Sequence, residues 1–581
     1  PYSPFNPAAE NIADLIYRFG SLQSERWNNT SSLCADYVSS DYIILHMPLT
    51  PDAVSMRVHP YYMIPSLFSP LDYNAMEASG ILSAFNSPAL NNQGKGVLIG
   101  LVDTGIDYRS PLFQNPDGTT RIAGIWDQSV PIEEDVLPAG VPDYYPMGGS
   151  SYGTEYTREQ INEALASDDP LSLVPTQDTI GHGTFLAGLS AGSSIPQEDF
   201  TGAAPEAELA VVKLKPAKKY LRDFYLIPSD APAFQENDIM MGIKYLRMMA
   251  DRLKKPLVIL LAMGSNSGSH IGTSPLSQVT QNYSGFFGII TVIACGNETG
   301  AAHHFYASIP AGTEYEDVEI RVGKEEAERG FVLELWAADA DTYTVGFISP
   351  SGERISRIPI IANNETSIPF LLDATTITVN YQLIEAESGS QLIFMRFQTP
   401  AAGIWTVRVY NTQRFKGTFH MWLPVQGMIS EETVFLRPDP YSTITVPGNS
   451  RLPITVGAYD TSTGGIYIHS SRGFTPNQIV KPELAAPGVN ILGPSVGRKP
   501  GSDTPMTTRT GTSAAAAITA GAAANLLGWG IVEGNYPTMS EASVKSYLIR
   551  GAQRNPALTY PNREFGYGTL DLFQTFLRLR E

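Results

Sequence analysis

A run of small residues near the C-terminus constrains the fold more than any other feature of this sequence. It reads Gly-Thr-Ser-Ala-Ala-Ala-Ala-Ile-Thr-Ala-Gly over residues 511–521. Alanine is the strongest helix former, and glycine, threonine and serine suit a helix start, so the run predicts a small-faced, buried helix. Ser513 lies in its first turn, where free backbone N–H groups and the positive end of the helix dipole stabilise negative charge. The position suits an attacking alkoxide, although an ordinary helix cap has the same residues.

Two further segments supply an acid and a base. The apolar run Val-Leu-Ile-Gly-Leu at 97–101 is typical of a buried parallel strand, and Asp103 follows at its end. Gly-His-Gly-Thr at 181–184 precedes an apolar stretch that predicts a buried helix behind His182. A serine hydroxyl is a poor nucleophile until an imidazole takes its proton, and a carboxylate has to fix the imidazole tautomer. The segments therefore predict a triad of Asp103, His182 and Ser513, in an order unlike those of the chymotrypsin and α/β-hydrolase folds.

These blocks resemble the signatures of subtilisin-like serine proteases. Val-Ile-Ala-Cys-Gly-Asn-Glu at 292–298 is similar to the block whose asparagine forms part of the oxyanion hole, which implies that role for Asn297. Leu-Leu-Ala-Met-Gly at 260–264 is similar to the strand that lines the specificity pocket. Three later blocks fit in the same order, at 454–458, 470–473 and 481–488. The resemblance implies substrate contacts from four residues: Ala262, Met263, Gly264 and Ala294.

A narrower resemblance is to the clostridial Csp germination proteases. It rests on residues 108–113, 121–128 and 268–270, and on a long insertion between Asn297 and Ser513. In that group the insertion is a jelly-roll domain, and the substrate is the precursor of a spore-cortex lytic enzyme. The resemblance therefore implies a serine endopeptidase that activates such a precursor during germination, in a spore-associated or extracellular setting.

The chain departs from the family pattern at three places. Ala514 and Ala517 stand where most members have Met and Pro, and Cys295 stands where alanine is usual. None of these residues does chemistry, so we expect altered packing and a buried cysteine in the pocket wall. Some Csp relatives have lost triad residues and act as pseudoproteases, whereas this chain retains all three.

Three alternative functions stay open at this point. A complete triad can be silenced by an occupied cleft, so one alternative is a non-catalytic Csp-like module for binding or sensing. Another is a secreted subtilase of broad specificity. A third is a pepsin-like aspartic protease, because Asp103-Thr104-Gly105 and Asp460-Thr461-Ser462 superficially resemble its paired motifs. That fold is all-β, however, and it leaves the blocks around His182 and Ser513 unexplained.

Composition sets the broad class of the protein. With 581 residues, 43% hydrophobic and 17% charged, the chain is globular and too long for a single core. The net charge of −19 argues against a nucleic-acid partner, which leaves a protein or peptide substrate. Two cysteines, Cys34 and Cys295, cannot build a disulfide framework. We expect no membrane span, because the longest apolar run noted, 257–263, fits a core strand.

Changes in pattern along the chain predict four parts. Strands and helices alternate from residue 97 to about 311, which predicts a parallel α/β sheet with helices on both faces. A period of two from 313 to 430 predicts an antiparallel β-sandwich, and the α/β pattern then resumes. We therefore expect a catalytic domain of 66–312 and 431–581, interrupted by a jelly-roll insertion of 313–430.

Residues 1–65 do not fit the catalytic domain. Residues 8–19 predict a short amphipathic helix, and 37–47 predict a strand pair or a bulged strand. Subtilases are made with an inhibitory prodomain, which Csp-like members can keep bound after cleavage. The resemblance thus implies a further partner, the chain's own prodomain, while a simple N-terminal extension is the alternative.

We expect no cofactor or metal site. His270, His303 and His304 are interpreted as packed or solvated residues, because adjacent histidines point apart on a strand and no third ligand has metal spacing. Subtilases often bind calcium, but no clear carboxylate-rich loop supports it here. Asp107 is interpreted as a structural carboxylate.

Overall fold

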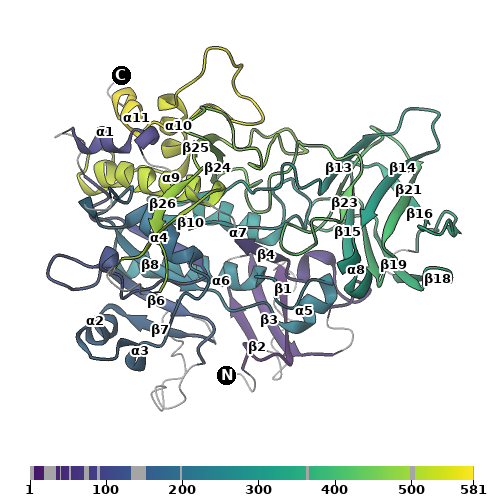
Figure 1. Ribbon diagram of the computed structural model, residues 1–581, viewed down its shortest axis with the longest axis horizontal. Helices are drawn as coiled ribbons and strands as arrows, with labels where there is room; N and C mark the ends of the chain where they lie inside the picture. Colours follow the sequence, from purple (N-terminus) through teal and green to yellow (C-terminus); the bar gives the residue numbers. More distant parts are fainter. Residues whose placement is uncertain are drawn as a thin grey trace.

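An eight-stranded sheet lies at the centre of the larger part of the molecule (Figure 1). The computed structural model describes residues 6–18, 34–39, 41–50, 54–70, 77–87, 90, 92–131, 152–196, 199–361, 365–497 and 504–579. The strand order is β25-β24-β12-β10-β5-β8-β6-β7, parallel throughout except for the antiparallel pairing of β7 with β6. The strands are β5 (Leu98–Asp103), β6 (Ile122–Asp127), β7 (Thr154–Thr157), β8 (Glu208–Lys213), β10 (Leu257–Leu261), β12 (Ile289–Ala294), β24 (Ile454–Tyr459) and β25 (Leu484–Pro487).

Both faces of this sheet are covered by helices. Helices α4 (His182–Ala191) and α9 (Thr512–Leu527) contact one face, and α6 (Glu236–Leu253) and α7 (Pro275–Ser284) contact the other. Alternate residues of β5 accordingly enter different cores, with Leu101 in the first and Val102 in the second. The predicted parallel α/β architecture is confirmed. The remaining helices of the described residues are α1 (Ile81–Phe85), α2 (Arg158–Ala166), α3 (Pro170–Leu173), α5 (Lys219–Tyr225), α8 (Lys324–Arg329), α10 (Glu541–Gly551) and α11 (Leu572–Arg578).

Helix α9 is the predicted helix of small residues, and every one of its residues is buried. It packs closely on α4: a Cβ added to Gly521 would lie 2.4 Å from the Cβ of Ala203 and 2.9 Å from the carbonyl oxygen of Ser190. With the π-turn that follows it, the helix is long and apolar enough to cross a membrane, and it is longer than the apolar run of 257–263 noted in the sequence. However, 83% of its apolar window is buried inside the fold, as in the core helix of a globular domain.

An antiparallel β-sandwich interrupts the α/β domain (green in Figure 1). Its core holds Trp405 and Phe397. It runs from residue 304 to 435 and so extends past the expected 313–430 at both ends. One sheet contains β13 (His304–Ser308), β22 (Thr418–Trp422), β15 (Phe331–Ala337), β20 (Leu392–Gln398), β19 (Thr375–Gln382) and β18 (Glu365–Phe370). The other contains β17 (Arg354–Ile355), β16 (Thr342–Ile348), β21 (Gly403–Gln413), β14 (Tyr315–Val322) and β23 (Val434–Phe435).

The N-terminal part forms a separate antiparallel sheet of β1 (Ile12–Arg18), β3 (Tyr42–Pro48) and β2 (Cys34–Tyr37), which we call the N-terminal sheet. The helix predicted over residues 8–19 is therefore wrong. The consecutive buried residues of β1 imitated a helical face because the strand is covered on both sides: Leu15 and Ile16 belong to different clusters. The strand pair predicted at 37–47 is present.

A short strand from the same N-terminal part reaches the catalytic domain. Strand β4 (Leu67–Pro70) is the middle strand of a three-stranded antiparallel sheet, between β9 (Phe234–Gln235) and β11 (Met263–Gly264). Two more short strands, β26 (Ile491–Pro494) and β27 (Met506–Arg509), form a hairpin that leads into α9.

The close packing of α9 on α4 gives a first prediction. Gly521→Val should lower the free energy of unfolding by about 1–3 kcal/mol, because the new side chain overpacks a rigid core. The measurement is the melting temperature. Gly285→Ala is the control, since Gly285 is exposed and has a φ of about −74°; it should leave the melting temperature nearly unchanged. An unaltered melting temperature for Gly521→Val would contradict the packing described.

Candidate active site

Asp103 ends the central strand β5 and is almost fully buried. Its Oδ1 accepts a hydrogen bond of 2.8 Å from the backbone N–H of Thr104 and lies 2.7 Å from Nδ1 of His182. A carboxylate in this setting can only accept, so the proton between Asp103 and the imidazole resides on Nδ1. The other ring nitrogen of His182 is thereby left as an acceptor.

Ser513 faces that acceptor. Its Oγ lies 3.2 Å from Nε2 of His182, across 331 residues of sequence. His182 is the first residue of α4 and Ser513 the second of α9, so the close packing of these two helices brings the two side chains together. Gly183 has to be a glycine, because a Cβ there would lie 2.1 Å from the carbonyl oxygen of Gly105. All three predicted triad residues thus form one hydrogen-bonded chain.

Asn297 lies beside the start of α9. Its Oδ1 accepts a hydrogen bond of 3.1 Å from the N–H of Thr512, which fixes the orientation of the amide. The four predicted substrate-contact residues lie on neighbouring segments, with Met263 and Gly264 in β11, Ala262 immediately before it, and Ala294 at the end of β12. The residues predicted from the sequence therefore lie together at the carboxyl ends of the inner strands of the central sheet.

Asp178 supports this arrangement, and sequence reasoning missed it. It is buried, and its carboxylate accepts hydrogen bonds from the hydroxyl of Thr104 (2.9 Å), the N–H of Gly181 (2.8 Å) and the N–H and hydroxyl of Thr184 (2.9 and 2.8 Å). It joins the loop after β5 to the first turn of α4. An aspartate just before a helix start, six residues ahead of a threonine, was the signal that could have revealed it.

Comparisons with known proteins agree with this geometry. The family model for subtilases matches residues 94–348 and 437–568. The chain belongs to the subtilase family. The solved structure of the Clostridium perfringens CspB protease is 30% identical, covers 87% of this chain and 97% of that one, and superposes with a TM-score of 0.74. The predicted resemblance to the Csp proteases is thereby confirmed.

Two curated plant relatives from Arabidopsis thaliana are more distant. The subtilisin-like protease SBT3.12 is 23% identical over 485 residues, and SBT3.5 is 23% identical over 545. The alignments cover 81% and 87% of this subtilase. The chain spans only 59% and 64% of the lengths of these relatives.

The other residues considered in the sequence have structural surroundings. Burial raises the pKa of the Cys295 thiol to about 12, so it stays protonated and is no nucleophile. His303 pairs with Glu298 at 2.9 Å, and His304 with His420 at 2.9 Å. Among the residues that the structure describes, no group of three or more His, Cys, Asp and Glu could hold a metal ion. Asp107 pairs with Arg109.

Strand β4 pairs with the strand that the sequence predicts to bind substrate. Met263 pairs with Pro70 and Gly264 with Ser69, while β9 pairs with the other edge of β4. The predicted cleft strand β11 is therefore already hydrogen-bonded to an N-terminal segment of the same chain. Phe68, in the middle of β4, is fully buried.

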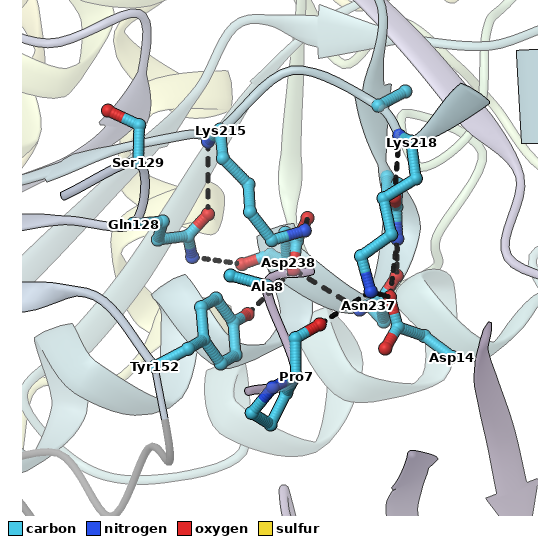
Figure 2. Close-up of polar contacts among 12 residues, drawn as sticks. Pro7, Ala8, Asp14, Gln128, Ser129, Tyr152, Lys215, Lys218, Asn237 and Asp238 are labelled. Carbon is cyan, nitrogen blue, oxygen red and sulfur yellow. Dashed lines mark hydrogen bonds and ion pairs between the residues drawn. The ribbon is translucent and has the colours of Figure 1, made fainter. Parts of the chain in front are cut away.

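A buried ionic cluster fastens the N-terminal sheet to the catalytic domain (Figure 2). Lys218 is 1% exposed, and its Nζ lies 2.7 Å from Oδ2 of Asp14. The same ammonium donates to the carbonyl oxygens of Pro7 (2.5 Å) and Ile12 (3.0 Å). All three hydrogens of the Lys218 ammonium thus bond the N-terminal part. Lys218 is the N-cap residue of α5, so this one side chain anchors the N-terminal part to the catalytic domain.

The cluster continues into the cleft strand β9. Gln235 accepts from the N–H of Lys218 (2.9 Å) and donates to Oδ2 of Asp14 (2.9 Å). On the other side of Asp14, His46 bonds Oδ1 at 2.7 Å and Oδ2 of Asp36 at 3.2 Å. Burial alone would lower the pKa of His46, but its hydrogen bonds to the two carboxylates outweigh this effect and raise the pKa to about 9. His46 is therefore a cation at neutral pH.

The role of Asp178 can be tested directly. Asp178→Ala leaves the buried N–H groups of Gly181 and Thr184 unpaired, so the melting temperature should drop and the rate of Ser513 labelling by a fluorophosphonate should fall at least about tenfold. Asp107→Ala is the matched control, because Asp107 is a carboxylate on the loop after β5 whose side chain pairs with Arg109. Equal effects of the two substitutions would contradict the positioning role.

Proposed function

We propose that this subtilase is a serine endopeptidase in which Ser513 attacks the scissile carbonyl. The observation that carries the proposal is the chain of hydrogen bonds from Asp103 through His182 to Ser513. Nε2 of His182 takes the proton of the hydroxyl and returns it to the leaving amine. Asp103 holds the tautomer and stabilises the imidazolium that forms.

The oxyanion of the tetrahedral intermediate has two candidate donors. The hydrogen bond from Thr512 to Oδ1 of Asn297 leaves the NH₂ group of that amide to serve the substrate. The backbone N–H of Ser513, at the positive end of α9, is the second donor. Both donors are preorganised before substrate binds, which is the condition for strong stabilisation of developing charge.

We propose further that the N-terminal part, up to at least Pro70, is an inhibitory prodomain that occupies the substrate cleft. Strand β4 pairs with both β9 and β11, as an extended substrate would when it adds a strand to a sheet edge. The buried cluster around Lys218 and Asp14 would keep this segment bound after cleavage. The proposed boundary lies beyond the expected 65.

The physiological substrate proposed for the chain is the precursor of a spore-cortex lytic enzyme, with the chain spore-associated or extracellular. The similarity to the CspB protease over nearly the whole of both chains supports this assignment. In this proposal the insertion is a jelly roll, as in the Csp proteases, and the reaction needs no cofactor.

One observation favours a second candidate function. A fully buried Phe68 within a strand paired on both edges makes the cleft occupied as it stands. A chain held in this state would act as a binding or sensing module with a complete but silent triad. Reactivity of Ser513 separates the two candidates.

The test is labelling by a fluorophosphonate probe, mapped by mass spectrometry, on the chain and on Ser513→Ala. We expect label on Ser513 in the unsubstituted chain and none in the variant, because only a serine activated by His182 reacts with the probe. Absence of label under every condition, including the opened variant described next, would favour the silent binding module.

Lys218 offers a way to open the cleft. Lys218→Met removes the buried ammonium that pairs with Asp14 and bonds the carbonyl oxygens of Pro7 and Ile12. Breaking a buried ion pair costs about 3–5 kcal/mol, so the N-terminal part should detach and Ser513 should label faster. The matched control is Lys219→Met. Lys219 is the next residue, but its ammonium forms an exposed pair with Asp223 that contributes little. Faster labelling in both variants, or in neither, would contradict the anchoring role.

The charge of His46 gives a pH dependence. Its pKa rises from about 6.5 in the unfolded chain to about 9 in the fold, so its contribution is complete below about pH 6.5 and is lost as the pH rises through 9. The loss amounts to about 3 kcal/mol. The melting temperature should therefore fall between pH 6.5 and 9.5, and should fall much less in His46→Gln, which keeps the size but not the charge. Parallel profiles for the two proteins would refute this.

A further inference from the structure

A threonine fills the slot beside the cleft strand. Gly264 ends β11, and Gly296 lies in the turn after β12; the side chain of Thr445 lies between them. A Cβ added to Gly264 would come within 2.5 Å of the Thr445 Oγ1, and one added to Gly296 would come within 2.7 Å of its Cγ2. Thr445 is itself fully buried. This side chain thus bounds the space that both glycines leave open.

Thr445 is held firmly in this position. Its N–H donates to the carbonyl oxygen of Cys295 at 3.0 Å, and its hydroxyl donates to the same oxygen at 3.3 Å. The next residue, Val446, forms two backbone hydrogen bonds with Ser265, of 2.9 and 3.1 Å. A β-branched side chain with a bonded hydroxyl, on a backbone fixed by these bonds, has few other rotamers, so the slot cannot deepen by a simple side-chain movement.

The slot faces one particular residue of a bound peptide. The pairing of β4 shows that an extended chain runs antiparallel to β11, with Ser69 opposite Gly264 and Pro70 opposite Met263. The next residue of a peptide bound in this register would lie beside Ala262. The carbonyl to be attacked has to lie near both Ser513 and Asn297. Its residue is therefore flanked by Ala262–Gly264 on one side and by the turn that contains Gly296 on the other. Its side chain enters the slot that ends at Thr445.

We infer that Thr445 restricts the residue preceding the cleaved bond to a short side chain, such as alanine, and excludes aromatic rings. This inference rests on the proposed peptidase function and specifies its substrates. Thr445 belongs to residues 436–446, the segment by which the chain leaves the sandwich after β23. The segment that joins the sandwich to the second part of the catalytic domain therefore contributes the residue that sets the depth of the slot.

The test uses two peptides that differ only in alanine or phenylalanine before the cleaved bond, with the full chain carrying Lys218→Met to free the cleft. The alanine peptide should have a kcat/KM at least about tenfold higher, since a single surplus methylene in a closed pocket already costs about that factor. Adding Thr445→Gly should raise kcat/KM for the phenylalanine peptide at least about tenfold and leave the alanine peptide within about threefold.

Thr443→Gly is the matched control. Thr443 is a buried threonine of the same segment, but its hydroxyl bonds the Thr299 hydroxyl and the Arg472 N–H, away from the two glycines. It should leave the ratio between the two peptides unchanged. A chain that cleaves both peptides equally, or a ratio that Thr445→Gly does not move, would overturn the inference.

A binding measurement separates this inference from the proposed function. In a chain that carries both Ser513→Ala and Lys218→Met, the same peptides, fluorescently labelled, should bind with the same preference for alanine, whether or not the chain with Ser513 cleaves them. If Ser513 never labels but the alanine preference in binding persists and disappears with Thr445→Gly, the peptidase proposal fails and the slot stands. If neither peptide binds, or both bind equally, the inference about Thr445 is wrong.

Discussion

The two strand edges of the substrate cleft are the constraint on which the rest of the structure depends. Strands β9 and β11 each present backbone N–H and C=O groups on the side that faces the other, and β4 fills the gap between them. Unpaired backbone groups in a buried cleft raise the free energy of the fold, so a segment that supplies the missing strand binds there favourably. A peptide substrate offers the same groups. In the proposed function, catalysis and inhibition therefore compete for one set of hydrogen bonds.

That competition gives a reason for the buried charges between the N-terminal sheet and the catalytic domain, which belong to Asp14, Asp36, His46 and Lys218. A buried ion pair is a weak source of net stability, because desolvation offsets most of the Coulomb attraction. Removing only one partner of the pair is nevertheless strongly destabilising, because it leaves a buried charge unpaired. The pair therefore makes the binding of the N-terminal part specific. Lys218 bonds two N-terminal carbonyls as well as Asp14, and Gln235 connects Asp14 to β9 itself. The anchor and the cleft strand thus form one polar network, so that a segment lacking these partners would not be retained.

The sequence predicted those features that are local and failed on those that depend on distant partners. The triad, Asn297 and strands such as β5 and β10 could be predicted because each lies in a short block with its own apolar pattern. The helix predicted for residues 8–19 was wrong because β1 is covered on both faces, and its partner β3 cannot be read from its own residues. Asp178 was missed because its positioning role depends on a hydrogen bond to Thr104, in the loop after β5, which is distant in the sequence. Thr445 carries no motif, and only the approach of Gly264 and Gly296 reveals its role.

The sandwich is more than an appendage to the catalytic domain. Glu334 of β15 accepts hydrogen bonds from the hydroxyl of Tyr61 at 2.6 Å and from the N–H of Gly268 at 3.0 Å, so it binds the N-terminal part and the segment beyond β11 at once. Leu67, on the side of β4 opposite to Phe68, packs in a cluster with Trp336 of the same strand β15. The segment that leaves the sandwich then delivers Thr445 to the slot. The sandwich thus contacts β4, and the segment that follows it carries Thr445. In the proposed function, a shift of the sandwich would therefore alter inhibition and specificity together.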